Sequence, residues 1–211
     1  KVWGPDKLAA SGIGSRDDWM LRAGEKWHGF GDLAEGFNLL DPIKSTIITP
    51  GLDVTGKFAK TGIPASIVTK FLAEHGVVVE KTGLYSLFIM FTIGITKGRW
   101  NTLLTALQQF KDDYDKNHPL WKVLPEFVQK NPRYERVGLR DLCTQIHSVY
   151  KQNDVARLTT EMYLSDMVPA MRPADAFAKM AHRDIERVPV DELEGRVTAV
   201  LLTPYPPGIP L

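Results

Sequence analysis

The sequence predicts a mixed α/β (α+β) protein, and three features indicate this class. Short runs rich in β-branched residues indicate strands, whereas longer stretches with apolar residues at three- and four-residue spacing indicate helices. In the first half of the chain these patterns follow one another as strand, helix, strand, strand and helix, which is typical of a compact layered domain. The second half shows short helices separated by prolines and then one strand. We therefore predict two domains, residues 1–118 and residues 119–211.

The elements of the first half follow from their local patterns. Residues 11–40 are rich in glycine and charge, and we expect a long structured loop there. Residues 44–51, KSTIITPG, alternate in polarity and end at Pro-Gly, which predicts a strand and a turn. Pro64 opens a stretch with helical spacing, and Gly76 is placed to end that helix. The run VVVE, residues 77–80, predicts a strand that stops at its glutamate.

The remaining elements are predicted in the same way. Residues 84–95 are apolar on both faces, which favours a central strand. Residues 98–117 predict an amphipathic helix. Its expected buried face comprises Trp100, Leu103, Leu104, Leu107 and Phe110. Residues 124–154 and 172–188 predict short helices with proline stops, and residues 196–210 predict a strand running into a proline-rich extended segment.

Composition excludes several classes of function. Lys+Arg 26 against Asp+Glu 25 leaves a net charge of +1, so we expect no nucleic-acid partner. The longest apolar run, residues 84–95, is too short and too interrupted to span a bilayer, so we expect no membrane partner. The single cysteine, Cys143, permits no internal disulfide, which fits a reducing cytoplasm. Lys1 lies within a strand-like run and the chain ends on an apolar segment, which we interpret as an internal fragment of a larger protein.

Glu80 and Tyr205 are the candidate binding residues. Ligand groups usually lie where strands end beside loops, and a carboxylate there could hold a substrate ammonium or guanidinium. Such a pair at about 4 Å gives roughly 1 kcal/mol in water and about 4 at an effective dielectric near 20, so partial burial would make it selective. The alternatives for Glu80 are an ion pair with Lys81 or Lys97, or simple exposure. Tyr205 lies between prolines and could wall a pocket and donate a hydrogen bond, or simply pack.

For the histidines and the cysteine, the sequence predicts structural roles. The five histidines show no metal-ligand spacing with one another or with the cysteine, so we expect no metal site. We expect His75 at a helix end, where the helix dipole favours it, and His147 on a helix face. Cys143 has no nucleophile motif around it and is expected in the core. From the residues alone, the prediction is an α/β fragment with a cation-binding carboxylate.

Several long motifs resemble the prokaryotic ornithine/lysine/arginine decarboxylases. They are WHGF (27–30), LLDPIKSTIITPG (39–51), GIPASIVTKFLAEHGVVVEKTG (62–83), FTIGITKGRWNTLLTAL (91–107) and PYPPGIPL (204–211). They occur in the family's order over essentially the whole chain, which makes the resemblance specific. Within the family, EHGVVVEKTG is most similar to the lysine-specific enzymes.

This resemblance implies a fold and an activity. It implies the small domain of the aminotransferase fold over residues 1–118 and most of an α+β C-terminal domain over residues 119–211. The activity would be pyridoxal 5′-phosphate-dependent decarboxylation of lysine to cadaverine and carbon dioxide. Ornithine or arginine decarboxylation, or a non-catalytic assembly or regulatory relative, are the alternatives. The family's enzymes are built from dimers, commonly five in a ring, so we expect self-association, with a homodecamer as its form.

The resemblance also assigns roles to residues. Glu80 would bind the distal amine of the substrate, and Tyr205 would line the same pocket. The lysine that binds the cofactor covalently follows a histidine in a Ser-x-His-Lys motif, which this sequence does not contain. That lysine belongs to a large domain in the family, so we expect no catalytic or cofactor-binding residue in this chain, and the chain alone to be inactive.

Overall fold

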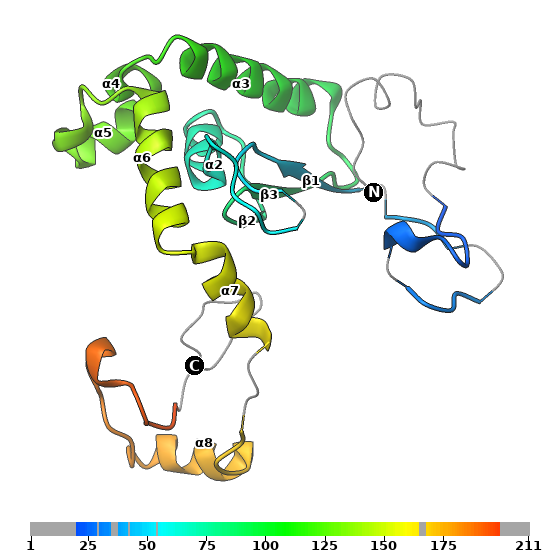
Figure 1. Cartoon of the computed structure of the whole chain (residues 1–211), viewed down its shortest axis with the longest axis vertical. Coiled ribbons are helices and arrows are strands. Elements are labelled where there is room, and N and C mark those ends of the chain that lie inside the picture. Colours follow the sequence, from blue (N-terminus) through cyan, green and yellow to red (C-terminus); the bar gives the residue numbers. More distant parts are fainter. Residues whose placement is uncertain are drawn as a thin grey trace.

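The computed structural model describes residues 20–28, 30–34, 38–41, 43–53, 55–164 and 168–198. A small sheet and the helices α2 to α6 form one body, α7 leads away from it, and α8 lies at the far end (Figure 1). The described part of the predicted loop at residues 11–40 contains a 3-10 turn, Lys26–His28, and an isolated bridge between Met20 and Leu39. The strand predicted at residues 196–210 lies almost wholly outside the described residues.

The sheet has three antiparallel strands in the order β1-β3-β2. They are β1 (Lys44–Ile48), β2 (Lys81–Thr82) and β3 (Ser86–Met90). Ile47 pairs with Leu87, whereas Thr46 pairs with Phe88 on the opposite face. Leu87 and Ile89 are buried in the hydrophobic core. The prediction of β1 and of a central strand within residues 84–95 is confirmed.

The strand predicted at residues 77–80 is wrong. Gly76 has a φ of 75° and lets the chain turn back at the end of α2, so the Val77 N–H donates to the Leu72 carbonyl at 2.9 Å. Pairing with β3 begins when the Glu80 N–H donates to the Phe88 carbonyl at 2.9 Å. Glu80 therefore precedes a short strand instead of ending one.

Helices α2 (Ala65–Glu74) and α3 (Lys97–Asp115) pack beside each other and cover the sheet (Figure 1). The buried positions of α3 are Leu103, Ala106, Phe110 and Asp113. The predicted face is therefore wrong at Trp100 and Leu104, which are 40% and 46% exposed. The buried row includes Asp113, a charged residue that a hydrophobic pattern misses. Gln109 donates to its carboxylate at 3.0 Å and His118 Nδ1 contacts it at 2.6 Å, so its burial is compensated.

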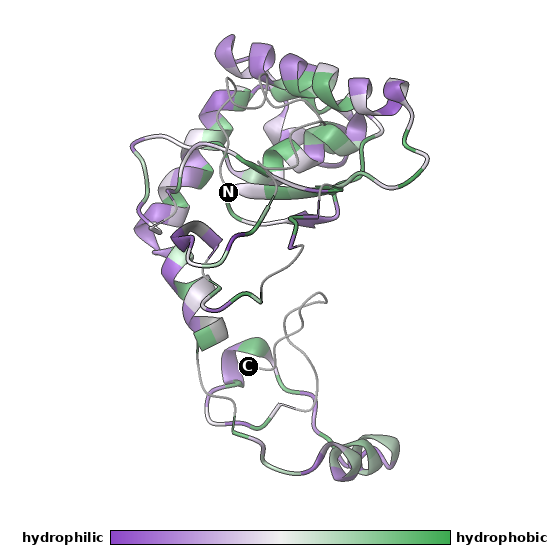
Figure 2. Ribbon diagram, turned by 90° about the vertical axis from the view of Figure 1, so that its right-hand side faces the viewer, coloured by the Kyte–Doolittle hydropathy of each residue, from purple (hydrophilic) through white to green (hydrophobic). Residues whose placement is uncertain are grey.

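The second half is helical, as predicted. Its helices are α4 (Leu120–Val123), α5 (Pro125–Lys130), α6 (Leu139–Gln152), α7 (Val155–Leu164) and α8 (Pro173–Ala181), with 3-10 turns at Pro132–Tyr134 and Val190–Glu192. None of the residues of α8 is buried. Figure 2 shows that apolar residues line the sheet and the helices packed on it, and that α8 lies apart from them.

One hydrophobic core joins the two halves of the chain. Buried residues of α4 to α6 belong to the same cluster as those of α2, α3 and the sheet. Leu120, Leu139 and Cys143 are each 0% exposed within it. The domain boundary at residues 118/119 stays a prediction, but the two sides share an interior.

We expect the substitution Glu74→Ala to lower the free energy of unfolding by about 1 kcal/mol, or up to about 2. The Glu74 carboxylate accepts hydrogen bonds from the N–H groups of Glu126 and Phe127, at 3.2 and 3.0 Å, and so caps the start of α5. Glu74→Gln keeps an acceptor and should cost less. Denaturant titration measures the difference. Lys70→Ala is the control, because it removes the 3.8 Å ion pair and leaves the cap; an equal loss in this control would contradict the capping role.

Candidate functional site

Glu80 lies at the surface, in the link between α2 and β2. Val77 and Val79 are half-buried, whereas Val78 and Glu80 are exposed. Within the described part of the chain, the Glu80 carboxylate makes neither a hydrogen bond nor an ion pair. The alternative of an ion pair with Lys81 is therefore not found among these residues, nor is one with Lys97. An exposed carboxylate with no partner in the described ranges could accept a hydrogen bond from a cation of the substrate.

The backbone around Glu80 is held on both sides. After it, Lys81 and Thr82 pair with Phe88 and Leu87, and the Gly83 N–H closes the turn on the Ser86 carbonyl at 2.8 Å. The Thr82 hydroxyl lies 2.9 Å from the Thr69 hydroxyl of α2. The backbone that carries this carboxylate is thus held by a short hairpin attached to a helix.

Tyr205, the second predicted binding residue, lies outside the described residues. Its proximity to Glu80 is therefore a prediction that rests on the resemblance alone. Of the predicted pair, only Glu80 is placed by the structure.

A buried Tyr85–His147 hydrogen bond lies near this hairpin and was missed by the sequence reasoning. Tyr85 is in the turn between β2 and β3, and His147 is on α6, as predicted for a helix face. The Tyr85 hydroxyl oxygen lies 2.6 Å from His147 Nδ1. Tyr85 is 4% exposed and His147 is 2% exposed. No local signal predicts the contact, because the residues lie 62 positions apart. Burial raises the pKa of Tyr85 to about 12, with smaller contributions from Tyr150 and Cys143, so the phenol stays protonated.

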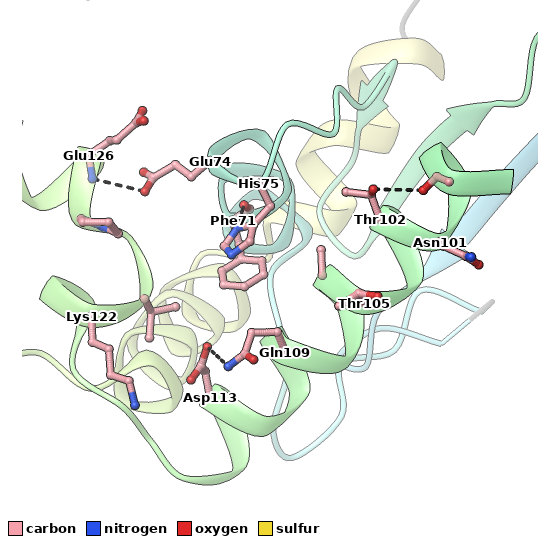
Figure 3. A pocket seen from close by; sticks show the side chains of 14 residues that line it. Phe71, Glu74, His75, Asn101, Thr102, Thr105, Gln109, Asp113, Lys122 and Glu126 are labelled. Atoms are coloured by element: carbon pink, nitrogen blue, oxygen red, sulfur yellow. Dashed lines mark hydrogen bonds between the residues drawn. The ribbon is translucent and has the colours of Figure 1, made fainter. Parts of the chain in front are cut away.

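A groove of about 730 Å³ opens elsewhere, between the end of α2, α3 and the α4–α5 corner (Figure 3). Its charged and polar lining includes Glu74, His75, Gln109, Asp113, Lys122 and Glu126. The two buried carboxylates are already satisfied, Glu74 by the start of α5 and Asp113 by Gln109 and His118. His75 ends α2 as predicted, with its Nδ1 2.8 Å from the Phe71 carbonyl. Glu80 is not part of this groove, and its lining shows no arrangement of nucleophile and base.

Cys143 is a core residue, as predicted. It is fully buried, and burial raises its pKa to about 12, so the thiol is protonated at neutral pH. We expect the Cys143 peptide of the folded protein to stay unlabelled by a maleimide at pH 8, and to label fully after denaturation. Mass spectrometry of the digested protein measures this. Rapid labelling of the native state would contradict the burial.

The described part of the chain shows no metal site. It contains no cluster of three metal-ligating side chains. A lysine that carries pyridoxal phosphate needs an enclosed site and a lowered pKa. Lys111 and Lys179 instead have raised pKa values, because hydrogen bonds to Asp115 and Asp184 stabilise their charged forms. Neither of these two lysines fits that role. No helix in the described ranges has the length and apolar character needed to cross a membrane.

Comparison with known proteins identifies the family. Residues 1–99 match the family model of the Orn/Lys/Arg decarboxylase major domain, and residues 156–211 match the model of the C-terminal domain of the same family. The chain belongs to the Orn/Lys/Arg decarboxylase family. The two matched stretches leave residues 100–155 between them, so they do not test the predicted boundary.

Relatives with different substrates share this part of the family's sequence. The chain is 50% identical to lysine decarboxylase LdcA of Pseudomonas aeruginosa over its whole length, which is 28% of the length of LdcA. It is 40% identical to the inducible lysine decarboxylase of Escherichia coli, covering 29% of it. It is 37% identical to the biodegradative arginine decarboxylase of Escherichia coli, covering 93% of this chain and 26% of the enzyme.

Solved structures show the same fold. Lysine decarboxylase A from Pseudomonas aeruginosa matches 92% of this chain with a TM-score of 0.80 and 52% identity, and this match covers 26% of that structure. The Francisella novicida lysine decarboxylase LdcF matches 94% of the chain with a TM-score of 0.79 and 37% identity, covering 28% of that structure. The predicted α+β class and family resemblance are confirmed. The chain spans about a quarter to a third of the length of these relatives.

Proposed function

We propose that this chain is part of a pyridoxal 5′-phosphate-dependent decarboxylase that converts L-lysine to cadaverine and carbon dioxide. Family membership supports a basic amino-acid substrate. The 50% identity with a lysine decarboxylase over the whole chain, against 37% with an arginine decarboxylase, favours lysine. The cofactor would stabilise the electron pair left when carbon dioxide departs, and residues outside this chain would bind it. On this proposal the 211-residue chain alone is inactive.

In the proposed enzyme, Glu80 binds the distal ammonium of lysine. The observation that carries this role is the exposed carboxylate, which has no hydrogen-bond or ion-pair partner among the described residues and follows α2 at the start of the hairpin. Hydrogen bonds to charged groups are worth about 1.5–3 kcal/mol, and this contact strengthens if other parts of the polypeptide cover it. Tyr205 is proposed to line the same pocket. Neither residue does the bond-breaking chemistry; they select and position the substrate.

Direct competition tests the substrate. The full-length protein, loaded with pyridoxal phosphate, would receive lysine, ornithine and arginine together, and the amine products would be quantified over time. We expect cadaverine to dominate. Mainly putrescine or agmatine would assign an ornithine or arginine decarboxylase of the same family. No product from any of the three would favour the non-catalytic relative.

The proposal includes the assembly and compartment suggested by the resemblance. We expect the full-length protein to form dimers that associate into a decamer in the cytoplasm. Light scattering of the purified protein measures the mass of the assembly. A monomer at micromolar concentration would contradict this part of the proposal.

A further inference from the structure

The Tyr85–His147 pair is more tightly enclosed than a simple core contact requires. A Cβ atom added at Gly51 would lie 2.2 Å from the Tyr85 ring, and one added at Gly62 would lie 2.3 Å from His147 Nδ1. Phe58 packs edge-on against both rings, with centroids 6.2 Å from Tyr85 and 5.9 Å from His147. Backbone and rings therefore confine both side chains to one arrangement.

The hydrogen bonds define which atoms donate. His147 Nε2 lies 3.1 Å from the Ala59 carbonyl oxygen, which can only accept, so Nε2 carries the proton. In neutral His147, Nδ1 is then the acceptor, and the Tyr85 hydroxyl donates to it at 2.6 Å. The pair thus joins the turn at Tyr85, helix α6 and the loop at residues 50–62 through directional contacts.

The same turn determines where Glu80 lies. The Tyr85 carbonyl accepts from the Thr49 N–H at 2.9 Å, and the preceding Leu84 carbonyl accepts from the Ala65 N–H at 2.9 Å. This anchored turn connects β2 to β3 along the chain, and the two strands also pair with each other. The Glu80 N–H donates to the Phe88 carbonyl of β3, and the next residues, β2, pair with β3 as well. We therefore expect a shift of the turn that joins β2 to β3 to move the backbone at Glu80 and its carboxylate.

We propose that Tyr85 and His147 are positioning residues for Glu80: their hydrogen bond sets how far the carboxylate reaches, and so which length of dibasic amino acid is preferred. This inference rests on the proposed role of Glu80. Selection by chain length needs a fixed distance, because one methylene changes the discrimination by only about 10- to 200-fold. A stiff, buried support is the structural means of fixing that distance.

Tyr85→Phe tests the proposal in the full-length, cofactor-loaded enzyme. The variant keeps the ring and removes the hydroxyl. We expect KM for lysine to rise about 10-fold with kcat changed about twofold or less, and the preference for lysine over ornithine to fall by about 10-fold. Tyr150→Phe is the matched control: its ring lies 6.1 Å from that of Tyr85, and its loss of a hydroxyl leaves the Tyr85–His147 bond intact. A lowered melting temperature with unchanged KM and preference would overturn the proposal.

Two His147 variants provide a test that does not depend on Tyr85→Phe folding. His147→Asn places an amide near the Nδ1 position and keeps an acceptor for Tyr85, whereas His147→Gln places it near Nε2 and keeps the contact with Ala59. We expect Asn to retain the lysine preference and Gln to lose it. If Gln retained the lysine preference and Asn lost it, the proposal that the Tyr85 contact with Nδ1 positions Glu80 would be contradicted. If Glu80→Gln alters KM and none of these variants does, the amine-binding role of Glu80 stands and the positioning role falls; if Glu80→Gln has no effect, both of these roles fall.

Discussion

Replacing Glu80 with glutamine in the full-length enzyme should lower kcat/KM for lysine by about 10- to 150-fold, which corresponds to the loss of a charge-assisted hydrogen bond of about 1.5–3 kcal/mol. Glutamine has the same shape and keeps one acceptor, so the loss isolates the charge. The carboxylate is exposed and makes no hydrogen bond or ion pair within the described residues, so the folded state should depend little on it. We therefore expect an unchanged melting temperature and unchanged cofactor absorbance. Steady-state kinetics over a wide range of lysine concentration measures the effect.

Glu135→Gln is the control for the change of net charge. Glu135 is also exposed, and it lies in the turn after α5. Its substitution should leave kcat/KM for lysine unchanged. Equal kinetics for wild type and the Glu80 variant would reject the proposed amine-binding role, although family membership would stand.

Gly62→Ala should lower the free energy of unfolding by about 3 kcal/mol. The new Cβ would lie 2.3 Å from His147 Nδ1 and 2.9 Å from the Gly51 Cα, and neither neighbour can move freely. Either the imidazole moves and breaks its buried hydrogen bond with Tyr85, or the backbone of the 50–62 loop shifts. Both responses cost free energy, because the site is already filled. Denaturant titration or calorimetry of the purified protein measures the loss.

Gly98→Ala is the matched control. Gly98 lies in the first turn of α3, and the nearest atom to an added Cβ is Thr96 Oγ1 at 3.9 Å. Alanine favours helix over glycine by about 0.5–1 kcal/mol, so this variant should be as stable as the wild type or slightly more stable. A Gly62 variant with the stability of the control would contradict the close packing of the Tyr85–His147 pair.

Local sequence patterns predicted most of the helices and strands. They failed where a contact outside the local pattern determines the conformation of the chain. β3 was predicted because residues apolar on both faces are typical of a central strand that is covered on both sides. Helix α2 was predicted because Pro64 and Gly76 mark its two ends. The error at residues 77–80 arose because β-branched residues favour strands, whereas the hydrogen bond from Val77 to Leu72 holds the chain against the helix end.

The candidate site was predictable only in part, for the same reason. Glu80 was predicted to bind a substrate amine from its place at the end of the VVVE run and from the family motifs around it, and this role stays a prediction. The Tyr85–His147 contact and the burial of Asp113 depend on α6 and on His118, and their spacing gives no periodic signal. The role of Glu74 as a cap for α5 is likewise set by residues 52 and 53 positions away.

The shared core has a practical consequence for making chimaeras between family members with different substrates. A crossover near residue 118 would join α3 from one parent to α4 and α6 from another, and would combine two unmatched sets of interior side chains. Leu120, Leu139 and Cys143 are fully buried, and because protein interiors are close-packed we expect a larger neighbour to fit poorly beside them. A crossover after α7 avoids this, because α8 contributes no buried residue. Exchanging the stretch from β1 through α7 as one block should therefore transfer Glu80 together with the loop, sheet and helix that hold its backbone.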